Sequence, residues 1–366
     1  MPSLILSGSR TLDAESSIRA LGLTSTEATE FWHAGKWTKP ETSNTTADLR
    51  GIHSVGGGVT WASGTNGTVL RTEDGGFEWQ TCSMPPGAEK LDFRGIQAFD
   101  ANTAIVMSSG KGDLSRLYKT TDGCASWKLI YTNPDADGFW DALAVVGKDL
   151  MLLGDPVGGS FVLEKSQDAG ATWKREQIPP SESAEGAFAA SNSSLVLGDN
   201  GRSVLFGTGG PEGARVFMRC GSCEGRGWSV QHPSAFSKGA SSGIFSMAAD
   251  PPFRHLVAVG GDYSKPNQRG SAAFTGDRKS WQPAQTPPHG YRSSVAYDAA
   301  AKTWITVGPN GTDISTDDGK TWRPLQPDPA RHETADADRN WNALSLPFVV
   351  GPHGRVGKLN PNALKP

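Results

Sequence analysis

The chain has 366 residues, among them 45 Gly, 24 Pro and 12 Trp, and its 35 Lys and Arg against 38 Asp and Glu leave a formal charge of −3. Near-neutral charge without a basic run excludes the electrostatic footprint of a nucleic-acid binder, and no apolar run reaches the roughly 18 residues of a membrane-spanning helix. Abundant Gly and Pro favour short strands and tight turns, although at roughly 150 residues per domain the length would allow two or three domains.

The start of the chain, residues 1–7, lacks the charged and apolar regions of a signal peptide. We expect residues 1–30 to form a tail and residues 31–366 to form one domain. Within that domain, residues 31–37 are predicted to be a strand and residues 40–48 a connecting loop.

A turn motif, Ser/Thr-x-Asp-x-Gly-x-x-Trp, recurs along the chain. It is complete at residues 72–79, 166–173 and 315–322, and altered at residues 120–127, 221–228 and 275–281. The six motif Trp residues lie 41 to 55 positions apart, close to the roughly 40–50 residues of a four-stranded propeller blade. The motif resembles the Asp box of BNR/Asp-box propellers. Because an Asp side chain bonds the backbone of its own turn, we expect structural roles for Asp74, Asp122, Asp168, Asp277 and Asp317.

Short apolar runs separated by Gly turns precede the boxes and predict the other strands of each blade. In the first blade they are residues 49–55, 59–64 and 68–71, and in the sixth 291–297, 303–308 and 311–314. Residues 341–346, 348–351 and 354–359 form three strands of a seventh blade with no box, and residues 31–37 are expected to supply its fourth strand. The predicted fold is all-β, a single seven-bladed β-propeller of four-stranded blades with Asp-box turns, closed by the N-terminal segment.

Candidate ligand-binding residues lie where the inner strands begin, on the face of a propeller that usually carries the site. The aligned first positions of blades one to seven are Arg50, Arg94, Trp140, Glu185, Ser242, Arg292 and Trp341. Opposite the arginines, Asp141 begins the inner strand of blade three. The turns after the second strands are expected to carry Asp155, Asp199 and Asp262. Two interpretations stay open: an arginine arc that grips carboxylate or phosphate groups, with Trp140, Trp341 and the aspartates completing the site, or a solvated rim of strand-capping residues.

The cysteines and the short motifs predict no metal or cofactor. Cys220 and Cys223 form a lone CxxC, for which a local disulfide or two free thiols are favoured over zinc, because Cys82 and Cys124 belong to other blades. No phosphate-binding glycine loop or serine-hydrolase motif is present.

A closer resemblance rests on residues 139–145, 154–157, 186–191, 207–210, 243–246, 259–266 and 290–297. They resemble a bacterial BNR/Asp-box family that is similar to the photosystem II stability/assembly factor propellers. Members often carry labels such as oxidoreductase or sialidase-like, and the resemblance covers roughly residues 31–360. It implies a periplasmic or secreted protein and a docking patch for a partner protein, with Arg50, Arg94 and Arg292 as its candidate residues.

Two functions remain possible. The preferred one is a non-catalytic, monomeric binding or assembly module that holds an acidic ligand or a protein segment on the channel face, without a cofactor. The alternative is a sialidase-like or other glycoside hydrolase at the channel mouth, where Tyr291 and Glu185 could accompany the arginines. The Arg-Ile/Leu-Pro signature of sialidases is absent before the first box.

Overall fold

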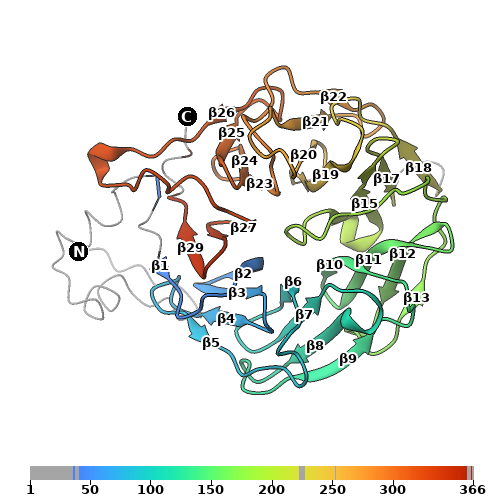
Figure 1. Ribbon diagram of the computed structural model, residues 1–366, viewed down its shortest axis with the longest axis vertical. Helices are drawn as coiled ribbons and strands as arrows, with labels where there is room; N and C mark the ends of the chain where they lie inside the picture. Colours follow the sequence, from blue (N-terminus) through green and yellow to red (C-terminus); the bar gives the residue numbers. More distant parts are fainter. Residues whose placement is uncertain (1–35, 38–40, 222–226, 252, 361–363, 365–366) are drawn as a thin grey trace, which may run out of the picture.

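The structure is a computed structural model that describes residues 36–37, 41–221, 227–251, 253–360 and 364. The expected tail, residues 1–30, and most of the predicted strand at residues 31–37 lie outside the described residues. Seven antiparallel sheets form a ring (Figure 1), which confirms the seven-bladed propeller. Three short 3-10 turns, Gly112–Leu114, Asp199–Gly201 and Pro329–Arg331, interrupt the described strands, and no helix in this part of the chain could span a membrane.

Each blade has four strands, ordered here from the channel outward. They are β2 Leu49–Gly56, β3 Val59–Gly64, β4 Val69–Thr72 and β5 Gln80–Thr81; β6 Phe93–Ala98, β7 Ala104–Ser108, β8 Arg116–Thr120 and β9 Lys128–Thr132; β10 Trp140–Val146, β11 Asp149–Val157, β12 Ser160–Ser166 and β13 Lys174–Arg175; β14 Leu195–Gly198, β15 Ser203–Gly207, β17 Val216–Arg219 and β18 Trp228–Gln231; β19 Gly239–Ala249, β20 Leu256–Asp262, β21 Ser271–Thr275 and β22 Gln282–Pro283; β23 Ser294–Asp298, β24 Thr303–Gly308, β25 Gly311–Ser315 and β26 Arg323–Pro324; β27 Ala343–Ser345, β28 Phe348–Val350, β29 Arg355–Lys358 and β1 Glu41–Thr42. A further strand, β16 Gly209–Gly210, pairs with β19.

The boxes are structural, as predicted. In five of them the Ser or Thr hydroxyl donates to the Asp carboxylate at 2.8–2.9 Å. The same carboxylate accepts backbone N–H groups of the turn, as Asp168 does from Thr172 at 2.8 Å. The box Trp then packs against the preceding blade: Trp127 meets Trp61 edge-on and Trp173 stacks on Tyr131. Each box therefore ties its own blade to the preceding one.

The box glycine is required for two reasons. Gly76, Gly170 and Gly319 all have φ between 82° and 94°, a region that disfavours side chains. A Cβ at these positions would also lie within 2.6–2.9 Å of Phe348, Ile130 or Val257, which belong to the preceding blade. Blade two has Cys124 in this slot at a φ of 67°.

The ring is closed by the N-terminal segment, through Trp37 of the predicted strand and through residues that follow it. β1 pairs with β29 through Glu41 opposite Val356, and Trp37 forms an isolated bridge with Leu359. Trp37 is buried and stacks on Trp341 with ring centroids 6.0 Å apart. Part of the stretch predicted to be a connecting loop, residues 40–48, therefore forms the closing strand, because its backbone satisfies the free edge of β29.

The centre of the ring is crossed by residues 186–194, which precede the inner strand of blade four. Asn192 exchanges two hydrogen bonds with the backbone of Leu143 in blade three, at 2.7 and 2.9 Å. The Ser193 and Ser246 hydroxyls are 2.6 Å apart, which ties the segment to blade five, and Ser191 donates to the Ser293 carbonyl of blade six at 2.7 Å. The segment thus occupies the channel and is held by polar contacts from several blades.

A disulfide joins Cys82, just after β5, to Cys124 in the box of blade two, with Cα atoms 5.3 Å apart. Cys220 is disulfide-bonded too, which favours the disulfide alternative for the CxxC pair, although Cys223 lies outside the described residues. Within the part of the chain that the structure describes, no cluster of His, Cys, Asp and Glu could hold a metal ion.

Removing the Cys82–Cys124 crosslink by a Cys82→Ser/Cys124→Ser double substitution is expected to lower the free energy of unfolding by about 2–4 kcal/mol. A matched Cys82→Ser/Cys124→Gly variant should recover about 1 kcal/mol, because glycine accepts the positive φ of this slot. Urea unfolding followed by tryptophan fluorescence measures both, and a Gly variant less stable than the Ser variant would contradict the explanation.

Candidate functional site

A cavity of about 410 Å³ opens where the inner strands of blades one to three begin. Its charged lining consists of Arg50, Arg94, Asp141 and Asp155, and its aromatic lining of Phe139, Phe188, Phe245, Tyr263 and Tyr291. Ala187, Ala189 and Ala190 of the segment that crosses the channel form the remaining wall. A concave site with apolar walls and a few convergent polar groups is typical of ligand binding.

A β-bulge directs one residue of each contributing inner strand into the cavity. The strand register shifts at Arg50 in β2, at Arg94 in β6, at Asp141 in β10 and at Phe245 in β19. A bulged residue leaves the regular alternation of the ladder, which re-aims its side chain. Four equivalent positions in four blades thus supply two guanidinium groups, a carboxyl group and an aromatic ring.

The two arginines are held side by side by one carboxylate. Asp92 lies 3.3 Å from Nε of Arg50 and accepts a 2.8 Å hydrogen bond from Nε of Arg94. Arg94 also donates to the Ala189 carbonyl at 3.1 Å, and a terminal nitrogen of Arg50 lies 4.0 Å from Asp48. A guanidinium has five N–H donors, so both arginines keep donors for a further acceptor at the cavity.

The two aspartates lie together within the cavity lining. Asp141 is 1% exposed, and its Oδ2 has no hydrogen-bond partner among the described residues. Burial, together with the nearby charge of Asp155, raises the pKa of Asp141 well above its usual value, against the attraction of Arg94. Burial also raises the pKa of Asp155 to about 6, although Asp155 accepts a 3.0 Å hydrogen bond from the Ala187 amide. These carboxyl groups are therefore desolvated without a cation of their own.

The aromatic wall is tightly packed. Phe188 stacks on Phe245 with centroids 3.9 Å apart, and Tyr291 meets Phe245 edge-on at 4.8 Å. Tyr291 is buried, which raises the pKa of its hydroxyl, whereas Tyr263 is 54% exposed at the rim. The sequence predictions missed this wall, although the repeated Gly-x-Phe of Gly186–Phe188 and Gly243–Phe245 was a signal for it.

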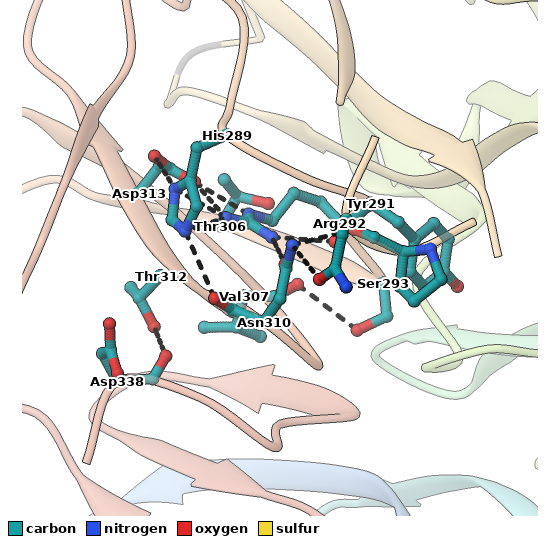
Figure 2. A network of polar contacts seen from close by, with 12 residues as sticks. His289, Tyr291, Arg292, Ser293, Thr306, Val307, Asn310, Thr312, Asp313 and Asp338 are labelled. Carbon is teal, nitrogen blue, oxygen red and sulfur yellow. Dashed lines mark hydrogen bonds and ion pairs between the residues drawn. The ribbon is translucent and has the colours of Figure 1, made fainter. Parts of the chain in front are cut away.

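Arg292 does not join the other arginines. Its side chain is fully buried, and its Nε donates to Asp313 at 2.8 Å while a terminal nitrogen donates to Asn310 at 2.6 Å. Figure 2 shows His289 beside both Arg292 and the same carboxylate, with Nδ1 of His289 2.8 Å from Asp313. Burial alone would raise the pKa of Asp313, but the His289 hydrogen bond and the charge of Arg292 outweigh it and lower that pKa. The prediction that Arg292 converges with Arg50 and Arg94 is wrong.

The register at the start of the inner strands explains why Arg292, Trp140 and Trp341 do not lie where they were predicted. Leu49 and Trp140 pair with Gly64 and Gly154, and a Cβ on these glycines would strike the carbonyl just before Leu49 or Trp140. Gly308 and Gly351 stand in the same relation to Arg292 and Trp341. Arg292, Trp140 and Trp341 therefore align with Leu49, at the position where side chains point between blades. In blade three this position lies one residue before the bulge.

Both tryptophans are accordingly core residues. Trp140 is fully buried and stacks on Tyr131 with centroids 5.4 Å apart. Trp341 is fully buried as well, and its indole N–H donates to the Ala337 carbonyl at 3.1 Å. Neither lines the cavity, so their predicted contact with a ligand is wrong.

The remaining acidic candidates lie elsewhere. Asp199 falls in the 3-10 turn between the first and second strands of blade four, not in the turn after the second strand, and so lies at the opposite end of the blade. Asp262 ends β20 beside the rim, where hydrogen bonds from Ser264 and Ser241 lower its pKa to about 2. Glu185 is buried against Arg215, whose Nε donates to it at 2.9 Å.

Comparisons with known proteins agree on the fold. No family model matches the chain, and no curated protein matches it. Among solved structures, YCF48 bound to a D1 peptide is similar over 88% of this chain and 96% of its own, with 18% identity and a TM-score of 0.62. YCF48 from Cyanidioschyzon merolae is similar over 89% of this chain and 99% of its own, with 18% identity and a TM-score of 0.62.

A GH74 xyloglucanase from Xanthomonas campestris is similar over 90% of this chain, with 15% identity and a TM-score of 0.58. This chain covers 54% of that enzyme. At such identities the likeness establishes a shared propeller fold, and function has to be argued from the cavity.

The buried and the cavity arginines should differ sharply in their effect on stability. Arg292→Leu is expected to cost about 3–5 kcal/mol, because it leaves Asp313 buried without its guanidinium. Arg94→Leu removes a partly exposed ion pair and should cost less than about 1 kcal/mol. Adding Asp313→Leu to Arg292→Leu should restore part of the loss. Urea unfolding of the three variants tests this, and equal stability of the two single variants would contradict the assignment.

Proposed function

We propose that this propeller is a non-catalytic binding module whose cavity holds an acidic ligand or an acidic protein segment. The observation that carries the proposal is the convergence of Arg50 and Arg94 on Asp92 at the mouth of an aromatic-lined cavity. Guanidinium groups recognise carboxylate and phosphate through paired N–H donors. Asp92 engages their Nε edges, so terminal amino groups remain for a ligand.

Two further observations support this proposal. The cavity walls combine aromatic rings, of which Phe245 and Tyr291 are buried, with small residues, and this suits the apolar part of a ligand beside its charged end. A propeller of the same fold, YCF48, has been solved with a D1 peptide bound, so the fold can present a peptide site.

The disulfides bear on where the protein acts. Cys82 and Cys124 are joined, and Cys220 is disulfide-bonded as well, a usage typical of oxidising compartments. We propose a periplasmic or secreted location, in line with the family resemblance. Thiol alkylation of protein taken from its native source without reductant should label no cysteine, and extensive labelling would contradict the location.

Glycoside hydrolysis is the second candidate, and the two carboxyl groups favour it. A carboxyl group with a raised pKa, such as Asp141, can act as a general acid, and a second one nearby can act as base or nucleophile. Turnover of aryl-glycosides by the wild-type protein that disappears in both Asp141→Asn and Asp155→Asn would support hydrolysis over simple binding.

The binding proposal predicts that an Arg50→Ala/Arg94→Ala variant loses its partner. Capture from an extract of the native source, quantified by mass spectrometry, should recover at least about tenfold less of the partner, as expected when charge-assisted hydrogen bonds are lost. A control variant, Arg254→Ala/Arg323→Ala, removes two exposed arginines outside the cavity lining and should behave like wild type. Equal recovery by the cavity variant would sink the proposal.

A further inference from the structure

The carboxyl side of the cavity is short of positive charge. Asp141 lines the cavity, is 1% exposed, and has one carboxyl oxygen without a hydrogen-bond partner among the described residues. Arg94 is the positive group that acts on it electrostatically. However, Nε of Arg94 is held by Asp92 at 2.8 Å and a terminal nitrogen by Ala189 at 3.1 Å. A desolvated carboxyl oxygen without a hydrogen-bond partner costs free energy, and this one lies in the wall of the cavity.

Asp155 likewise lacks a positively charged partner among the described residues. Its carboxylate accepts the Ala187 amide at 3.0 Å, a neutral donor that does not balance a charge. Asp155 and Asp141 also repel each other when both are ionised. A single cation placed between them would relieve the desolvation of both and their mutual repulsion.

The aromatic wall suits such a cation. Phe188, Phe245 and Tyr291 pack against one another within the same cavity lining, with centroid distances of 3.9 and 4.8 Å. The faces of aromatic rings attract ammonium groups, and more strongly where water is excluded. Carboxyl groups and aromatic rings in the lining of one cavity are the chemistry that recognises an ammonium group.

We propose that the cavity binds a small dipolar ligand, a free amino acid or a dipeptide, with its carboxylate on Arg50 and Arg94 and its ammonium group between Asp141, Asp155 and the aromatic rings. This inference rests on the proposed role of the two arginines and adds the opposite end of the ligand. The cavity volume of about 410 Å³ lies in the range of small-molecule sites, roughly 300–1,000 Å³.

The proposal predicts that ligand binding is coupled to the release of protons. In the free protein burial raises the pKa of Asp155 to about 6, so this carboxyl group is largely neutral below that pH. An ammonium group favours the ionised form, so binding near pH 6 releases protons, and affinity falls as the pH drops below about 6. The other ionisable groups that line the cavity with the pair are Arg50, Arg94, Tyr263 and Tyr291.

The test is isothermal titration calorimetry with the dipeptide Ala-Phe, its N-acetyl derivative and its C-terminal amide. Ala-Phe is expected to bind at least about tenfold more tightly than either derivative, since each derivative loses one charge-assisted contact. At pH 6, titrations in two buffers of different ionisation enthalpy should report proton release for Ala-Phe and none for N-acetyl-Ala-Phe.

Asp141→Asn should abolish the preference for Ala-Phe over its N-acetyl derivative. Asp155→Asn should shrink the proton release, and it serves as a second variant if Asp141→Asn does not fold. Equal binding of Ala-Phe and N-acetyl-Ala-Phe to the wild type would overturn the dipolar ligand and leave the arginine site standing. Equal binding of Ala-Phe and its amide would instead count against the arginines. Failure of all three probes would overturn the inference alone, because partner capture by Arg50 and Arg94 is measured separately.

Discussion

Every sheet in this ring is covered on both faces by its neighbours, so the ordinary alternation of a strand offers no direction that leads into the cavity. A β-bulge at the start of the inner strand removes this constraint at one position in each of blades one, two, three and five. Arg50, Arg94, Asp141 and Phe245 occupy that position, and the residue before it is buried between blades. Fold and site therefore depend on the same β-bulge, because the bulged residue leaves the strand pairing and its side chain faces the cavity.

The same irregularity explains how far the sequence could be interpreted. The box turns recur with fixed chemistry, and Asp, Gly and Trp each have a local reason to be there, so blade number and fold class could be predicted. Arg50, Arg94, Asp141 and Asp155 line the cavity, whereas Arg292, Trp140 and Trp341 lie one residue earlier in the register. A one-residue shift moves a side chain from the site to the core, and no spacing in a single sequence marks a bulge.

Charge is distributed across the cavity in a way that net charge conceals. Two guanidinium groups share Asp92, and two carboxyl groups of the same lining are desolvated with raised pKa values. Natural proteins retain such costly groups chiefly where function uses them. YCF48 and GH74 propellers share the scaffold with this chain, yet loops and bulges supply the side chains here, so the likeness of fold does not carry the chemistry with it.

The segment at residues 186–194 affects how the blades of the ring unfold relative to one another. Repeat proteins usually behave as one-dimensional arrays, in which each unit interacts only with the units before and after it. Here Asn192 and Ser193 bond the adjacent blades three and five, and Ser191 bonds blade six, so blade four also contacts a unit that is not its neighbour in the ring. These contacts add to the interfaces between adjacent blades, so opening one blade disturbs contacts made by others. The propeller should accordingly unfold as one cooperative unit. Residues of the segment 186–194 form a wall of the cavity, so the cavity should be as rigid as the ring.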